Sequence, residues 1–204
     1  MTIRFHQRDL PAPITGIASI AIDTEAMGLN NTRDRLCVVQ MSTGDGTADL
    51  VQIERGQTEA PNLAAMLADP SIEKLFHFGR FDMALLAHTL GVMPAPVYCT
   101  KIASKLARTY TDRHGLKELS RELIGEDISK QQQSSDWGAP ALTDAQKAYA
   151  ASDVLYLHRI REKLDAMLER EGRAELAHAV FEALPTRVRL DLAGWENVDI
   201  FAHS

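Results

Sequence analysis

Apolar positions change their spacing midway along the chain, from short runs in the first hundred residues to helical spacing afterwards. The runs predict β-strands over residues 16–23, 34–43 and 47–53, joined by Gly/Asn/Asp-rich connections of hairpin length. A short helix over 60–70, a fourth strand over 73–79 and a helix over 80–92 that ends at Gly91 should follow. A strand, a helix and a strand in succession imply a parallel crossover, so we expect a mixed sheet.

The second half of the chain has the apolar spacing of amphipathic helices. We expect helices over 100–110 and 115–125, a polar loop over 127–140, and a long helix over 142–172. Thr143 or Asp144 should cap that long helix, and Gly172 should end it. A last helix over 174–184 runs into Pro185. The tail over 187–204 keeps large apolar residues, which predicts that it docks on this subunit or on another.

Length and charge limit the classes of function. At 204 residues the chain is most simply one domain, and its net charge of −6 offers no broad basic field for long nucleic acid. No apolar run approaches the ~20 residues of a membrane span, and no signal-peptide pattern opens the chain. We therefore expect a cytoplasmic protein that does not enter a membrane. Cys37 and Cys99 lie in apolar segments and are expected to be buried free thiols.

Two carboxylates, Asp23 and Glu25, come at the end of the first predicted strand. Residues two apart in a strand point to the same face, so both side chains should project together. Like charges at that distance are unfavourable unless a cation neutralises them. The pair alone is weak evidence for a metal site, because most such pairs lie on the solvent-exposed surface.

Further acids come from two predicted helices. Asp82 falls in the first turn after the fourth strand, where the simpler explanation is that it complements the helix dipole. Asp153 lies four residues after Tyr149 on an otherwise apolar helix face, where an unpaired buried carboxylate would be costly. Four acids from one strand and two helices would suit hard cations such as Mg²⁺ or Mn²⁺. Together they favour a site for two divalent metal ions that performs phosphoryl transfer.

The ordered set "DTE", "HFGRFD" and "YAASD" resembles the three exonuclease motifs of the DEDD superfamily of 3′-to-5′ exonucleases, in its tyrosine branch, and is most similar to RNase D over about residues 17–165. The resemblance implies an RNase H-like α/β fold, two divalent metal ions and hydrolysis from a free 3′ end. Carried over by motif, the metal ligands are Asp23, Glu25, Asp82 and Asp153, and Tyr149 is the base or the water-orienting residue.

RNase D continues into helical nucleic-acid-binding domains, whereas this chain ends at residue 204. Its "RDRLCVVQ" strand and its tail are similar to those of the compact nanoRNase C family, which removes very short RNAs. That resemblance implies short oligoribonucleotides, dinucleotides among them, as substrate, and a homo-oligomer, either a dimer or a larger ring. We predict one exonuclease domain over residues 1–204, with a mixed sheet flanked by helices and a helical C-terminal half.

The remaining candidates would touch the substrate. By resemblance, Leu29 wedges between the terminal bases, or else it anchors a turn, and Thr24 and Met27 line the same pocket. His77, Phe78 and Phe81 surround Asp82, where the aromatic rings either stack on bases or belong to the core. A basic stretch is either a phosphate clamp or a solvated helix end, and it contains Lys105, Arg108, Tyr110, Arg113 and His114. Gln132, Gln133 and Trp137 would line the mouth of the site, with Trp137 equally suited to be a packing anchor.

Two other classes of function remain open. One is the same chemistry on longer RNA or on single-stranded DNA, since no readable feature senses the 2′-OH. The other is an exonuclease-like scaffold that binds nucleic acid without cutting it. The presence of all four acids disfavours the scaffold.

Overall fold

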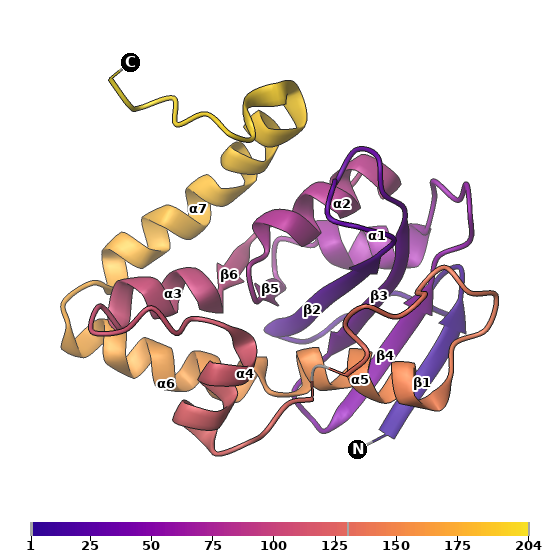
Figure 1. The fold of residues 1–204 in the computed structure, drawn as a ribbon, viewed down its shortest axis with the longest axis horizontal. Helices are drawn as coiled ribbons and strands as arrows, with labels where there is room; N and C mark the ends of the chain where they lie inside the picture. Colours follow the sequence, from indigo (N-terminus) through magenta and orange to yellow (C-terminus); the bar gives the residue numbers. More distant parts are fainter. Residues whose placement is uncertain (1, 130, 204) are drawn as a thin grey trace.

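A six-stranded mixed sheet in the order β1-β4-β3-β2-β5-β6 forms the centre of the computed structural model, which describes residues 2–129 and 131–203 (Figure 1). The predicted hairpins are confirmed, because β2, β3 and β4 pair antiparallel in succession. The crossover is confirmed as well, since β5 pairs parallel with β2. The strands are β1 Thr2–Gln7, β2 Ser19–Ala26, β3 Leu36–Ser42, β4 Thr47–Gln52, β5 Glu73–Phe76 and β6 Val97–Cys99.

Helices cover the sheet and extend beyond its β6 edge. In Figure 1, α5 crosses the sheet over β4 and β1, whereas α3, α6 and α7 gather past β5 and β6. The helices are α1 Pro61–Ala68, α2 Arg80–Leu90, α3 Thr100–Ala107, α4 Leu116–Leu119, α5 Asp144–Leu155, α6 Leu157–Arg170 and α7 Ala174–Leu190, with π-helical segments at Ser120–Ile124 and Asp191–Trp195. The predicted helical C-terminal half is confirmed.

The long helix predicted over 142–172 is two helices. Thr143 caps α5 in a capping box with Gln146, but Tyr156, with φ −107° and ψ −6°, separates α5 from α6. The buried side of α5 faces the sheet, while the buried side of α6, which includes Leu157 and Ile160, faces the other helices. One straight helix cannot follow both surfaces, so the backbone turns between them.

Helix α7 continues through Pro185, which was expected to end it. Proline inside a helix removes one hydrogen bond and costs ~3 kcal/mol. Buried side chains on both sides of the proline, Leu184 and Val188, offset that cost by packing into the core. Tertiary burial therefore outweighs the local helix-breaking signal.

Two strands were not predicted. Strand β1 pairs parallel with β4 at one edge of the sheet, and β6 has only three residues. Cys37 and Cys99 are buried and free, as expected. Among residues 2–129 and 131–203, no helix combines the length and the hydrophobicity that crossing a bilayer requires.

The tail is only partly held by this chain. Asp191 accepts two hydrogen bonds from the Arg80 guanidinium, at 2.5 and 2.9 Å, and also pairs with Arg187 at 2.8 Å. Beyond it, large apolar side chains stay open to solvent, with Trp195 46% and Phe201 91% exposed. The tail backbone is nevertheless held as far as Val198, because Arg80 donates to the Glu196 carbonyl at 2.7 Å and Arg187 to the Val198 carbonyl at 3.0 Å. The docking of the tail on its own subunit thus involves its backbone and Asp191, while its large apolar side chains stay exposed; Ser204 lies outside the described residues.

Candidate active site

Asp23 and Glu25 lie in the second half of β2, beyond the residues that pair with β5 but still paired with β3. The strand is buried up to Ile22, and its register with β3 shifts between Glu25 and Ala26. The two carboxylates are thereby held on one extended backbone segment, as their spacing predicted.

Helix α5 brings the third carboxylate to the same place. Asp23, Glu25 and Asp153 each offer an oxygen within 4.8 Å of the others. Tyr149, one helical turn before Asp153, lines the same pocket. Segments more than a hundred residues apart in the sequence therefore form one acidic cluster.

The cluster is electrostatically costly for the protein alone. Burial, together with the charges of Asp153 and Asp82, raises the pKa of Glu25 to about 9. Burial and all three neighbouring carboxylates raise the pKa of Asp23 well above its ordinary value. Burial and the charge of Asp153 also raise the pKa of the Tyr149 hydroxyl. A hydrogen bond with the Thr24 backbone opposes the rise in the pKa of Asp23 without cancelling it.

Asp82 takes a different position from the other three acids. It is almost fully buried at the start of α2, and burial raises its pKa to about 7. The Thr24 hydroxyl donates a hydrogen bond of 2.6 Å to its Oδ1. Asp82 therefore acts on Asp23 and Glu25 through its charge, while its Oδ1 is bonded to Thr24, the residue between them.

A pocket of about 310 Å³ opens over the cluster. Of the predicted site residues, it is lined by Asp23, Thr24, Glu25, His77, Gln133, Tyr149 and Asp153. Sequence reasoning missed the rest of the wall, which comes from the start of α4 with its cap residue and from the loop before α5: Gly115, Leu116, Lys117, Ile128 and Ser129. Lys117 is the one residue among these twelve with a permanent positive charge, and nothing in its local sequence distinguishes it from a solvated lysine.

Arg108, predicted as a phosphate clamp or as part of a solvated helix end, is neither in this chain. It is fully buried and donates to the Ser104 hydroxyl at 3.2 Å, to the Arg113 carbonyl at 2.8 Å and to the Glu122 carboxylate. An arginine can lie at zero exposure when its donors all find acceptors. Its role here is to hold the loop that leads to Gly115 at the pocket wall.

Trp137 is a packing anchor. It is 1% exposed, and its ring centroid lies 6.0 Å from that of Tyr149. It packs in a cluster with Cys37, Val38, Leu50, Leu142 and Ala150. Trp137 therefore supports the helix that carries Tyr149 and does not line the mouth of the pocket.

The other candidates lie outside this pocket. Met27, Leu29 and Tyr110 are 53%, 88% and 71% exposed, and Phe81 packs partly buried against the core. Phe78 has a positive φ of 66° and is half exposed, with the Lys101 Nζ 4.3 Å from its ring centroid. Lys105 lines a separate hollow beside Phe78, and Arg113 lines an open one that shares Gly115 with the carboxylate pocket.

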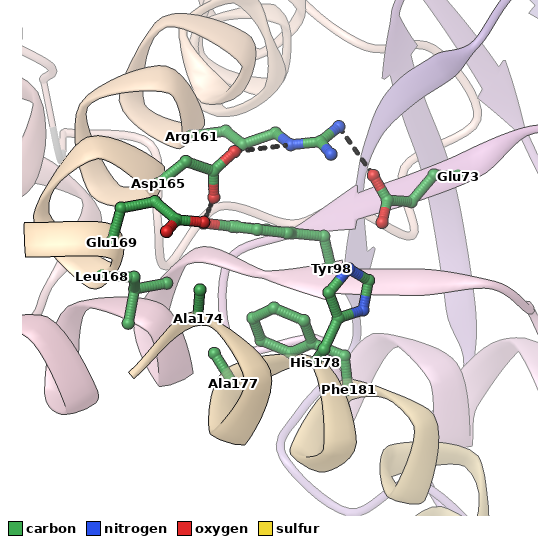
Figure 2. A pocket seen from close by; sticks show the side chains of 10 residues that line it. All are labelled: Glu73, Tyr98, Arg161, Asp165, Leu168, Glu169, Ala174, Ala177, His178 and Phe181. Carbon is green, nitrogen blue, oxygen red and sulfur yellow. Dashed lines mark hydrogen bonds and ion pairs between the residues drawn. The ribbon is translucent and has the colours of Figure 1, made fainter. Parts of the chain in front are cut away.

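A second cavity, of about 200 Å³, lies apart from the acidic cluster between the sheet, α6 and α7 (Figure 2). Its charged groups hold one another: Arg161 pairs with Glu73 at 2.6 Å and with Asp165 at 3.3 Å. The Tyr98 hydroxyl donates to Asp165 at 2.7 Å. These contacts join α6 to β5 and β6, so the four residues have a structural role that requires no ligand.

Residues 6–169 match the family model of 3′-5′ exonucleases, so the match includes the acidic cluster and Tyr149. The chain belongs to the 3′-5′ exonuclease family. Membership confirms the predicted superfamily and hydrolase class. Among curated members, ribonuclease D of Acidiphilium cryptum is 37% identical over 156 residues, which are 76% of this chain and 39% of that protein. The chain thus spans about two fifths of the length of that relative.

Solved structures of family members extend the comparison to the whole chain. The structure of Brucella melitensis NrnC with bound Mg²⁺ is 62% identical with a TM-score of 0.96, and covers 100% of both chains. The structure of NrnC bound to pGG is 63% identical with a TM-score of 0.97, at the same coverage. Escherichia coli RNase D is 28% identical with a TM-score of 0.75 over 89% of this chain and 48% of that one. The predicted RNase H-like fold and the resemblance to RNase D and nanoRNase C are confirmed.

Proposed function

We propose that this protein is a metal-dependent 3′-to-5′ exoribonuclease that hydrolyses short oligoribonucleotides, dinucleotides among them, to mononucleotides. The observation that carries the proposal is the convergence of Asp23, Glu25 and Asp153 within 4.8 Å beside Tyr149. Such a cluster has no packing rationale, because burial and mutual repulsion oppose its ionisation.

The donor set fits divalent metal ions. Carboxylate oxygens are the ligands that Mg²⁺ and Mn²⁺ prefer, and within the described ranges 2–129 and 131–203 no cysteine or histidine belongs to the cluster. We propose that Asp23, Glu25, Asp82 and Asp153 hold two such ions, with Asp82 turning from Thr24 or binding through its second oxygen. Bound ions would supply charge neutralisation at the scissile phosphate and a more acidic water. The Mg²⁺ in the NrnC structure supports the proposal.

Tyr149 is proposed to orient the attacking water. Its hydroxyl lines the pocket beside Asp153, and burial and that neighbouring charge raise its pKa in the metal-free protein. A hydroxyl that keeps its proton at neutral pH positions a water by hydrogen bonding and does not take the water's proton. Trp137 packs against the Tyr149 ring, which limits the directions in which the hydroxyl can point.

Short RNA is the proposed substrate because the pocket is small, about 310 Å³, and the charge of its described lining is more acidic than basic. Among the residues that the structure describes along the pocket, Lys117 and His77 can carry positive charge, which is too few to follow a long phosphate backbone. The structure of NrnC with pGG, at 63% identity, supports a dinucleotide-sized ligand. Processing of longer RNA and hydrolysis of single-stranded DNA remain the alternatives within the same chemistry.

A product time course on 5′-labelled RNAs of two to seven nucleotides, with DNA of the same sequences, tests the proposal. The expected result is metal-dependent loss of dinucleotides at a rate at least equal to that of the longer RNAs. Accumulation of dinucleotides would refute the substrate assignment. Full activity of Asp23→Ala would refute the site, while Glu162→Gln, on the exposed side of α6, serves as the matched acidic control.

A homo-oligomer is proposed from the exposed tail. Trp195, Val198, Ile200 and Phe201 lie within seven residues and are each 46% or more exposed. Such a concentration of large apolar side chains favours a protein interface. Light scattering after gel filtration should give a multiple of the 22.6 kDa chain mass, and Trp195→Ser with Phe201→Ser should reduce that mass. A monomeric wild-type protein would overturn this part of the proposal.

A further inference from the structure

A single glutamine interrupts the buried strand β3. Every residue of Leu36–Ser42 is buried, and five of the seven are apolar. Gln40 is 0% exposed in this strand, although a buried amide must find partners to offset its lost hydration. An apolar side chain at this position would serve packing better, so the glutamine requires another explanation.

The explanation lies on the neighbouring strand. Gln40 is the register partner of Asp23 in the antiparallel pair β2–β3, so their side chains lie on one face. The Gln40 Nε2 donates a hydrogen bond of 2.7 Å to Asp23 Oδ2. A bound cation would keep Asp23 ionised, and only the NH₂ end of the amide can donate to an ionised carboxylate, so this orientation of the glutamine suits the metal-bound site.

The fold itself gains little from this glutamine. The other end of the amide, Oε1, is buried and finds no hydrogen-bond partner in the described part of the chain. An unsatisfied buried acceptor costs about 1–3 kcal/mol, which is comparable to the gain from one bond to a charged group. The contact with Asp23 is therefore more important for the acidic cluster than for the stability of the sheet.

We infer that Gln40 is a positioning residue: by holding Asp23 Oδ2 it keeps the Asp23 carboxylate beside Glu25 and Asp153, with an oxygen available to a divalent cation. Three nearby carboxylates repel Asp23, and without a fixed donor its side chain would turn away from them. Partners that orient metal ligands typically change metal affinity 10- to 100-fold when they are removed. The inference rests on the proposed metal-dependent function.

Gln40→Met tests the inference, because methionine keeps the length of the side chain and removes the donor. The matched control is Gln52→Met, which removes a glutamine that is also buried in the sheet but bonds the Ala139 carbonyl at 2.9 Å and Gln7 at 3.0 Å, away from the cluster. Mn²⁺ affinity is measured by calorimetry on each full-length protein, together with thermal unfolding in EDTA. Gln40→Asn, which keeps the amide but is one methylene short, replaces Gln40→Met if the latter does not fold.

The expected result is a loss of Mn²⁺ affinity of about 10-fold or more in Gln40→Met, with wild-type affinity in Gln52→Met. The Mn²⁺ concentration that half-saturates hydrolysis should rise by the same factor. Unchanged affinity in the folded Gln40 variants, or an equal loss in Gln52→Met, would overturn the inference. A wild-type protein that binds no Mn²⁺ would instead overturn the proposed function, so the two failures are distinguishable.

Discussion

Replacing Glu25 with glutamine should stabilise the metal-free protein at alkaline pH while it abolishes hydrolysis. In the folded protein, burial and neighbouring charge raise the pKa of this carboxyl from 4.5 to about 9. The unfolded chain ionises above pH 4.5, whereas the folded protein keeps the proton until about pH 9. Stability from this group is therefore fully present below pH 4.5 and is lost as the pH rises towards 9.

The size of the effect follows from the pH interval over which Glu25 is ionised in the unfolded chain but protonated in the folded protein. One pKa unit corresponds to ~1.4 kcal/mol, so an isolated group taken from pH 4.5 to pH 8 would lose about 5 kcal/mol. Solvent enters the pocket, and the carboxylates share protons, so we expect about 1–3 kcal/mol. For a chain of this length, that is roughly 2–12 °C in melting temperature.

Thermal unfolding in EDTA at pH 4.5 and pH 8 measures this difference. Glu25→Gln should melt above the wild type at pH 8 and close to it at pH 4.5, with Glu162→Gln as the exposed control. Added Mg²⁺ should then raise the melting temperature of the wild type more than that of Glu25→Gln. A variant that is no more stable than the wild type at pH 8, or equally stabilised at both pH values, would refute the reasoning.

Three further substitutions separate chemistry from packing. Tyr149→Phe should lower the single-turnover rate constant about 10²-fold, because the attacking water loses the hydroxyl that orients it, and should leave Mn²⁺ affinity by calorimetry unchanged; a near-wild-type rate constant would contradict its role. Thr24→Val removes the 2.6 Å bond to Asp82 and should cost about 1–3 kcal/mol by chemical denaturation at pH 8, whereas Thr24→Ser should recover most of it. Arg108→Met leaves the Glu122 carboxylate without its buried partner and should cost about 2–4 kcal/mol in the same assay; a loss below about 0.5 kcal/mol would argue against a structural role.

Some elements are readable because their signals are local. The end of α2 follows from Gly91, which adopts the left-handed φ of 68° that glycine accepts most easily. The start of α5 follows from Thr143 and Gln146, a capping box within four residues. Strand β1 and the three-residue β6 escaped prediction, since short strands carry little periodic signal and depend on their neighbours for hydrogen bonds.

Part of the candidate site is local in the same way. Asp23 and Glu25 share a face because a strand repeats every two residues, and Tyr149 and Asp153 share one because a helix repeats about every four. The wall formed by residues 115–117 and 128–129 could not be foreseen, because its position depends on how the start of α4 and the loop before α5 pack against distant elements.

The sequence by itself determined the family, the mixed sheet, the helical second half and the candidate ligands, because each of these follows from backbone period or from an ordered set of motifs. Only the tertiary structure decided which polar residues are partners. It placed Gln40 against Asp23 through strand register, bonded Asp82 to Thr24, and buried Arg108 against Glu122. Burial and pairing between remote segments depend on distances in the folded protein, and the spacing of side chains along the sequence does not specify those distances.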